Sequence, residues 1–403
     1  MVLLSLPEHL RYRQEYIFLV TVIPGKPSKH QINHTLRRLV KQLLSFWEGV
    51  FYVRTAQYSL GRWVFIALMP AVCDTEGATQ LAGFASHTHT WFCRRCLLPL
   101  NEIHNLEPET WVRRDCGKHR EIALEWKDAP EARREAIYTE HGIRHSELLE
   151  LPYWDPILFT IIDDVHFAYL GLLKTHLEKI WFIDSERNVG WEDTTAQPAS
   201  SSIDEFRVSE SVSNPGSTPR HVIGKDLLAE IWADMGRTIL PTWIQAPPPK
   251  WGTIAAGKLS ADEYKVICSI SLVVTLIRVW GYENTEGVES RRFKMLQNYV
   301  DLVHAIHVLF LRETSQKSRA YYKSHMLRYL RTVLDLYPDI TLKSNHHLAI
   351  HIITDLENLG PGHARSTPVF ERVNHALQMI NSNQHLGKLS MDLALSFLNM
   401  YCR

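Results

Sequence analysis

The feature that most constrains this chain is a pair of short ligand motifs, Cys93-x2-Cys96 and Cys116-x2-His119. Two close pairs separated by roughly 20 residues match the layout of a tetrahedral Cys3His zinc site. The whole chain has only 6 Cys, so their gathering here favours a ligand set over coincidence. The set contains no carboxylate, which predicts a closed, structural Zn²⁺ site. His87 and His89 are nearby spare ligands, which we interpret as surface histidines.

Composition bounds the kind of protein. Lys plus Arg number 44 and Asp plus Glu number 44, which excludes a globally basic nucleic-acid binder. A hydrophobic share of 45% and a charged share of 22% are typical of a globular chain, and 403 residues suffice for two or three domains. The low cysteine count indicates a reducing compartment. The longest apolar stretch, Val266–Trp280, is interrupted by polar residues and is shorter than the ~20 residues of a membrane span. We therefore expect no membrane partner and no signal peptide.

The N-terminal part reads as α/β. An amphipathic helix is predicted over Gln31–Trp47, with its apolar residues on one face. Runs of β-branched and aromatic residues predict strands at Tyr16–Ile23, Phe51–Tyr58, Arg62–Val72 and Ile157–Ile162. A helix is expected over Asp163–Trp181. Strand, helix and strand in this order are typical of an α/β sheet.

Five segments follow from these patterns. They are a partial α/β region 1–92, a zinc-binding insert 93–119, a helical and α/β continuation 120–184, a disordered linker 185–222 and an all-helical region 223–403. The linker is rich in Ser, Pro and acids and lacks periodicity. In the last region, helices are predicted near Ala261–Trp280, Arg292–Thr314, Ser318–Tyr337, Leu342–Leu359 and Phe370–Ile380.

Several acids and histidines could carry chemistry. Asp74 ends an apolar strand, where a carboxylate could hold a divalent cation, although strand-end Asp residues also cap helices. Asp163 and Asp164 open a helix before His166, where acids could bind a metal or simply complement the helix dipole. His347 and His351 have the i, i+4 spacing that suits zinc. Without a third ligand in sight, we interpret them, with His346, as core or capping histidines.

Two basic stretches could neutralise phosphates. The segment Thr314–Leu334 has five Lys/Arg and no acid, and its DNA-contact candidates are Arg319, Lys323 and Arg328. A second stretch, 26–62, has seven Lys/Arg and one acid, Glu48. A solvated helix face is an equally good interpretation of such a pattern.

A set of strings along the chain resembles a known family. They are IPG at 23–25, FASH at 84–87, FCRRC at 92–96, LPYWDP at 151–156, DVH at 164–166, AGKL at 256–259, NHH at 345–347, GP at 360–361 and FER at 370–372. Their order is similar to that of the transposase of CACTA (En/Spm-like) DNA transposons, in its fungal form, and the likeness covers essentially the whole chain.

The resemblance implies a ribonuclease-H-like α/β catalytic core split by a helical insertion. It also implies three carboxylates that hold two Mg²⁺ ions for DNA cleavage and strand transfer. Asp74 matches the second acid and Glu371 is the best match for the third, with Asp163 or Asp164 as the alternative. Transposon-end DNA as the partner, a nuclear location and self-association as a further option follow from the same likeness.

The first acid has no counterpart. Residues 1–58 contain no Asp, and the opening of the chain resembles the strand that follows the family's first strand. We therefore expect an incomplete core and an N-terminally truncated, DNA-binding transposase relative without nuclease activity, in which Mg²⁺ would matter only if the site were competent. A zinc-stapled DNA-binding or protein-interaction module is the alternative. A third option is a nuclease that recruits Glu15 or Asp163.

Overall fold

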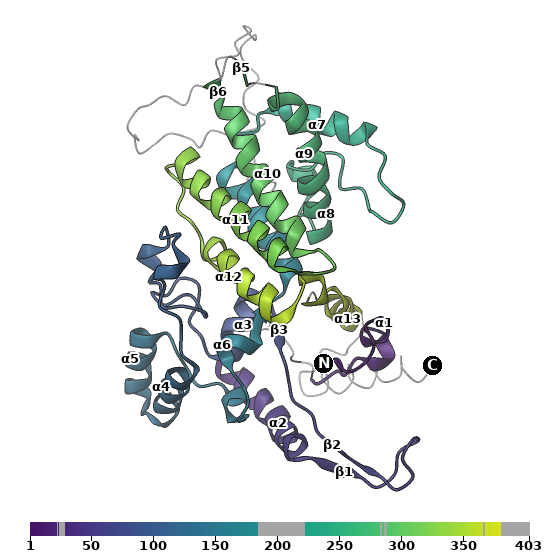
Figure 1. Ribbon diagram of the computed structural model, residues 1–403, viewed down its shortest axis with the longest axis vertical. Helices are drawn as coiled ribbons and strands as arrows, with labels where there is room; N and C mark the ends of the chain where they lie inside the picture. Colours follow the sequence, from purple (N-terminus) through teal and green to yellow (C-terminus); the bar gives the residue numbers. More distant parts are fainter. Residues whose placement is uncertain are drawn as a thin grey trace. The chain divides into compact units, whose positions relative to one another are not determined.

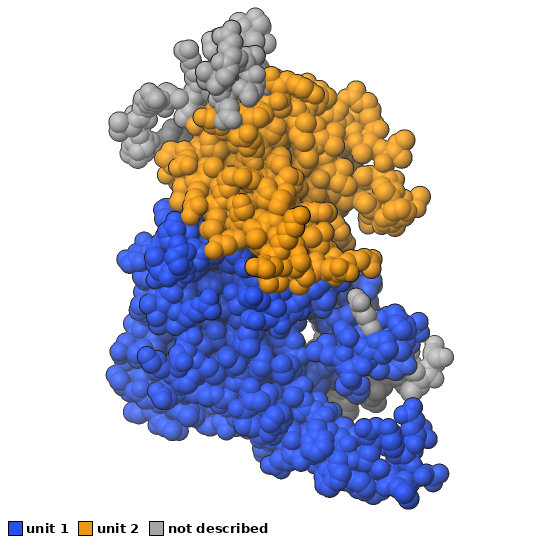
Figure 2. All heavy atoms as spheres, in the orientation of Figure 1, with its two compact units in different colours: residues 1–165, 342–403 blue, residues 166–341 orange. Residues whose placement is uncertain are grey.

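The computed structural model describes residues 1–379 except 22, 24–28, 184–221, 283, 286–287 and 366. The chain divides into two compact units, which Figure 2 distinguishes by colour. Unit 1 combines residues 1–165 with 342–403, and unit 2 is the segment 166–341 between them. The predicted all-helical region 223–403 therefore contributes to both units. The predicted linker 185–222 lies outside the described residues apart from Val222.

The described residues of unit 1 form two small sheets. Strands β1 (Val50–Tyr52) and β2 (Arg62–Val64) form an antiparallel hairpin that follows the helix α2 (Lys29–Glu48; Figure 1). Strands β3 (Ala71–Cys73) and β4 (Thr160–Ile162) pair in parallel, with Cys73 opposite Ile162. No sheet in the described part of the chain has more than two strands. The extended sheet of a ribonuclease-H-like core is not assembled among these residues.

Four strand predictions are corrected by the structure. Phe51–Tyr58 is a strand only in its first two residues, and Ile157–Ile162 only from Thr160 on, because Pro156–Phe159 is a short helix. Gln14–Tyr16 forms a 3-10 turn, and Ile17 makes only an isolated bridge to Val2, so the described residues of the run Tyr16–Ile23 do not form a strand. Phe18 is 54% exposed, and no strand among the described residues lies beside it to pair with. The run Arg62–Val72 is divided into β2 and the start of β3. Hydrophobic runs mark strand propensity, but a ladder forms only where a partner lies alongside.

The helices of unit 1 follow the apolar periodicity. Helix α2 (Lys29–Glu48) confirms the predicted amphipathic helix, and its Leu36, Val40 and Leu43 are buried in a core with Trp154. Each such leucine contributes about 1.5–3 kcal/mol by leaving water. The remaining α-helices are α1 (Glu8–Arg11), α3 (Thr75–Ala82), α4 (Cys116–Asp128), α5 (Glu131–His141), α6 (Pro156–Phe159), α12 (Ser344–Leu359) and α13 (Pro368–Gln378).

Unit 2 is mainly helical, as expected. Its α-helices are α7 (Lys225–Arg237), α8 (Ala261–Val266), α9 (Leu272–Trp280), α10 (Arg291–Leu309) and α11 (Gln316–Leu336). Between α8 and α9 the chain forms a π-helical turn, Ile267–Ser271. The predicted helix Asp163–Trp181 is confirmed as one continuous helical segment over 164–180, most of which is π-helical, in His166–Leu173 and His176–Ile180. A short hairpin, β5 (Asn284–Thr285) and β6 (Val288–Glu289), completes the unit.

Aromatic residues form the centre of unit 2. Trp181 is fully buried, lies 4.8 Å from the ring of Tyr299 and donates its indole hydrogen bond to Tyr337 at 2.8 Å. Large rings with satisfied polar atoms combine area burial with directional bonds, which makes this core specific. None of the helices in the described residues is both long and apolar enough to cross a bilayer.

Candidate metal centre

The loop that carries Cys93 and Cys96 is fixed by short backbone bonds. The amide of Arg95 donates to Cys93 Sγ at 3.2 Å, so the loop turns tightly around one sulfur. Leu97 N donates to Val112 O at 2.8 Å, and Arg114 N donates to Arg95 O at 3.1 Å. The loop is thus tied to the segment 112–114. Both cysteines are 1% exposed.

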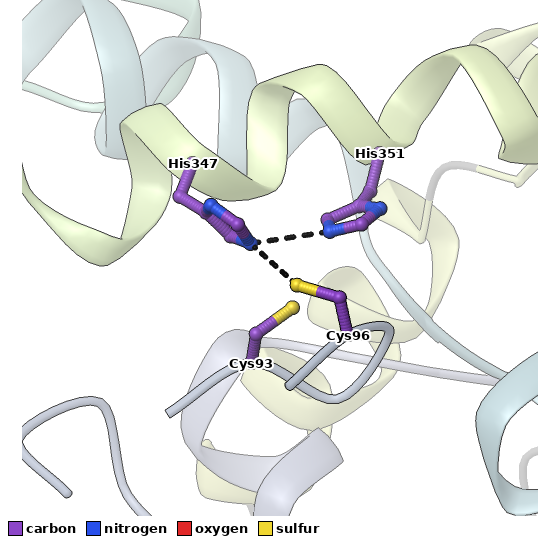
Figure 3. A group of neighbouring side chains, drawn as sticks. All are labelled: Cys93, Cys96, His347 and His351. Carbon is purple, nitrogen blue, oxygen red and sulfur yellow. Dashed lines mark hydrogen bonds between the residues drawn. The ribbon is translucent and has the colours of Figure 1, made fainter. Parts of the chain in front are cut away.

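Helix α12 supplies the other half of the cluster. His347 and His351 are one helical turn apart, so their imidazoles leave the same face of the helix. Figure 3 shows both rings pointing toward the two sulfurs. The ring of Trp111 lies 4.3 Å from that of His347, and Phe92 packs edge-on against His347 at 5.0 Å. These aromatic contacts hold the imidazole in one orientation.

The four ligand atoms converge. Cys93, Cys96, His347 and His351 offer two sulfurs and two ring nitrogens that all lie within 4.8 Å of one another. Cys96 Sγ is 3.2 Å from His347 Nε2, which is 3.1 Å from His351 Nε2 (Figure 3). Zinc bonds of about 2.0–2.3 Å place tetrahedral ligands at comparable separations. Two thiols and two imidazoles without a carboxylate form a complete donor set for Zn²⁺, and the residues fit this ion.

The pKa values of the side chains in the cluster are shifted by burial and by their mutual hydrogen bonds. Burial by itself would raise the pKa of Cys93, but hydrogen bonds from Cys96 and both imidazoles hold it well below the ordinary value. The pKa of Cys96 is raised because its thiol hydrogen is donated to Cys93 and because it is buried. Burial also lowers the pKa of His347. The pKa shifts of Cys93 and His347 are in the direction of a thiolate and a neutral imidazole, the forms that bind zinc.

Half of the predicted ligand set is corrected. Cys116 and His119 belong to the first turn of α4 and are not members of the cluster. His119 is 2% exposed and packs against the ring of Phe84 at 4.8 Å, and burial lowers its pKa to about 3. His119 thus behaves as a core residue. The spacing of the motifs correctly placed Cys93 and Cys96 together. It also predicted Cys116 and His119, the nearest second pair in the sequence, which lie outside the cluster.

The three histidines of α12 have different surroundings. His346 accepts the amide hydrogen of Lys343 at 3.0 Å, so the interpretation as a capping histidine is correct for it. His347 is also buried, but it and His351 lie with Cys93 and Cys96 in the group that could hold a metal ion. Their i, i+4 spacing was the available signal. Of the spare histidines, His89 accepts the amide hydrogen of Trp91 at 3.0 Å, and neither it nor His87 joins the group.

A buried ionic network adjoins the cluster. Arg95, between the two cysteines, is bonded to Asp355, which lies one turn beyond His351 on α12. Arg365 pairs with Asp164 at 2.9 Å and lies 4.0 Å from Asp355. The side chains of all four residues are at most 6% exposed. The loop 93–96 therefore contacts one face of α12 through two kinds of interaction. Its cysteines lie beside His347 and His351, and its Arg95 pairs with Asp355.

The proposed catalytic acids are placed differently from one another. Asp74 is exposed and caps α3, accepting the amide hydrogen of Gly77 at 2.5 Å. Asp163 follows the neighbouring strand β4 and bonds to Thr367 and to the amide of Val165. Glu371 is exposed in the first turn of α13. Among the described residues, these acids do not form a group of three close ligand atoms.

Asp164 predicts a pH dependence of stability. Burial raises its pKa to about 7, with further contributions from Asp355 and Asp163, against the lowering effect of Arg365. This folded-state pKa exceeds the unfolded value of about 3.9, so the folded state binds more protons between these values. We expect the resulting stability to be present below about pH 4 and to be lost as the pH rises through 7, by up to about 1.4 kcal/mol per pH unit. Urea unfolding at several pH values measures it.

The control for this dependence is Asp164→Asn, which keeps the shape of the side chain and removes the titration. We expect the variant to flatten the decline in unfolding free energy between pH 4 and 7. An identical slope in the variant and the parent protein would assign the dependence to other groups.

The DNA-contact candidates lie on α11 in unit 2. Lys323 is exposed and Arg319 is half-buried. Arg328 forms two bonds to Asp301, at 2.7 and 2.6 Å, and is 52% exposed. This carboxylate neutralises much of the Arg328 charge. The basic stripe is therefore weaker than the sequence pattern indicates.

The chain was compared with protein-family models and with curated proteins. No protein-family model matches the chain, and no curated protein matches it.

Proposed function

We propose that Cys93, Cys96, His347 and His351 bind one structural Zn²⁺. The converging, carboxylate-free donor set carries this proposal. Three of the four residues are buried, so the site leaves little room for a water or substrate as a fifth partner. The ion would supply charge neutralisation for the two sulfurs and a rigid tetrahedral anchor.

The position of the site in the chain gives the ion a role. Cys96 and His347 are 251 residues apart, and the whole of unit 2 lies between them. A Zn²⁺ ion held by both would link the two sequence segments of unit 1, which unit 2 separates in the chain. Ligands that are contributed from both parts of unit 1 would thus keep these parts together even when unit 2 moves or unfolds.

For the protein as a whole, we propose a transposase-derived DNA-binding protein that does not cut DNA. The motif order described above supports this proposal, as does a helical unit inserted into a discontinuous unit that contains a parallel strand pair. Asp74 and Asp163 end these two adjacent strands, where a ribonuclease-H-like site would need carboxylates. Zn²⁺ would be structural in this protein, and Mg²⁺ would have no complete site.

The engagement of the acids supports the absence of cleavage. Asp74 is used as a helix cap, Asp163 bonds to Thr367, and Asp164 is paired with Arg365. Two-metal phosphoryl transfer requires carboxylates that hold both cations at about 3.5–4 Å. We therefore expect no Mg²⁺- or Mn²⁺-dependent nicking of supercoiled plasmid by residues 1–403. Nicking that Asp74→Ala abolishes would instead establish a nuclease and identify Asp74 as a metal ligand.

DNA binding is tested through α11. Each neutralised phosphate contact changes the salt slope of duplex affinity by about 0.9. We expect Arg319→Gln, Lys323→Gln and Arg328→Gln together to weaken duplex binding and to flatten the slope by about 2. The effect is smaller than three full contacts because Arg328 is already bound to Asp301. Fluorescence anisotropy from about 50 to 200 mM salt measures the slope.

Lys118→Gln, on α4 of unit 1, is the matched control because Lys118 is exposed and lies far from α11 in the sequence. We expect it to leave the slope unchanged. An unchanged slope in the triple variant would favour the alternative function, a zinc-stapled protein-interaction module whose α11 face is merely solvated.

A further inference from the structure

The hairpin of residues 50–65, here called the aromatic hairpin, exposes a large apolar surface. Its exposed hydrophobic side chains are Phe51 (45%), Tyr52 (43%), Val53 (77%), Tyr58 (45%), Leu60 (91%), Trp63 (58%) and Phe65 (65%). An isolated two-stranded hairpin is marginally stable in water. An apolar patch of this extent marks an interaction site.

Register places three of the rings on one face. Phe51 lies opposite Trp63, with ring centroids 5.5 Å apart, and Phe65 follows Trp63 on the same side of the strand. Gly49 leaves room for this row: a Cβ there would lie 2.6 Å from the ring of Phe65, and its φ of +103° favours glycine. The result is a short platform made of Phe51, Trp63 and Phe65.

Positive charge lies on the hairpin beside the platform. Arg62 pairs with Tyr52 in the register, so its side chain leaves the face opposite to Phe51 and Trp63. Arg54 and Arg62 are exposed in the hairpin and form no ion pair with a described residue. The Arg62 guanidinium lies 4.4 Å from the centroid of the Tyr58 ring. Lys41, also exposed, lies on α2, the helix that leads into the hairpin (Figure 1). The single acid in this stretch is Glu48.

We propose that the aromatic hairpin binds unpaired nucleotides of a single-stranded nucleic acid. Flat apolar rings next to arginines match a polyanion whose bases are open to stacking. The base faces of duplex DNA are covered by their neighbours, so a duplex would leave the platform exposed. The bases would stack on Phe51, Trp63 and Phe65, and the long side chains of Arg54 and Arg62 would neutralise phosphates where the strand passes around the edge of the hairpin. This surface is separate from α11, and its function does not depend on duplex binding there.

The experiment uses the full chain and a labelled oligothymidylate of about 20 nucleotides, longer than typical single-strand sites of ~4–16. We expect Trp63→Ala to weaken binding about 10-fold, since loss of one stacking partner typically costs ~5–150-fold. Trp243→Ala is the matched control, because Trp243 is 83% exposed in unit 2. It should leave the affinity unchanged. Trp63→Phe keeps a ring and should restore most of the affinity. An oligouridylate of equal length tells whether DNA or RNA is preferred.

The charge contribution is measured separately. Arg54→Gln with Arg62→Gln should flatten the salt slope of oligothymidylate binding by about 1.4, at ~0.7 per single-strand phosphate. The proposal is overturned if Trp63→Ala and Trp243→Ala bind equally well, or if unlabelled duplex competes as strongly as the single strand. It is also overturned if Trp63→Ala only converts a dimer into a monomer in sedimentation, since a second copy of the chain would then cover the hairpin.

Discussion

Protein purified without chelator should contain one zinc per chain, and Cys96→Ser should lose it while Cys116→Ser retains it. Both substitutions remove one thiol, and only Cys96 belongs to the cluster of four converging ligands. The pair of variants therefore separates the Cys2His2 set of the structure from the Cys3His set that the local spacing predicts. Elemental analysis of the dialysed proteins measures the difference.

The effect on stability should be large. A structural zinc site can contribute an apparent ~10–16 kcal/mol, and this binding free energy becomes folding free energy. Loss of zinc should release the loop at Cys93 from α12 and expose both to protease. Unit 2 contains none of the four ligands, so we expect its aromatic core to resist digestion longer.

A spectroscopic control distinguishes the ligand sets without a folding readout. Cobalt exchanged into the site should give a tetrahedral spectrum, with thiolate charge-transfer absorption from two sulfurs. Substitution of either Cys93 or Cys96 should halve this absorption or abolish metal binding, while Cys116→Ser leaves it intact. Loss of zinc from Cys116→Ser together with retention by His347→Ala would reject the cluster and restore the Cys93–His119 site.

Asp355→Ala should lower the free energy of unfolding by about 3–5 kcal/mol, as expected when one partner of a buried ion pair is removed. The substitution leaves Arg95 without its carboxylate and removes the second acid beside Arg365, at 4.0 Å, while Arg365 keeps its closer partner Asp164. Because Arg95 lies between Cys93 and Cys96, we also expect weaker zinc binding. Chemical denaturation and competition with a chelator measure the two effects.

Two variants make this prediction specific. Glu357→Ala removes an exposed acid from the same helix and should cost within about 0.5 kcal/mol. Arg95→Met combined with Asp355→Leu replaces both charges by apolar groups and should recover much of the loss, because no buried charge remains unpartnered. If Asp355→Ala is no more harmful than Glu357→Ala, the network does not stabilise unit 1.

Local patterns determined much of the helical structure. The 3.6-residue periodicity predicted the helix found as α2 to within two residues at its start and one at its end. The helices α10, α11 and α12 were predicted to within five residues at each end. These elements form most of their hydrogen bonds within one segment, so a local reading is sufficient. The pair Cys93 and Cys96 was also found locally, because a single tight turn brings both sulfurs together.

The structure alone decided what lies opposite each local element. Tyr16–Ile23 has strand propensity but no described partner strand, whereas the three residues of β3 pair with β4 from almost 90 residues away. The zinc ligands follow the same rule. Cys96 meets His347 across 251 residues, while the nearby His119 turns into the core beside Phe84. Spacing in the sequence determines which side chains share one helix turn or loop; long-range packing of the two parts of unit 1 determines which of these turns face each other.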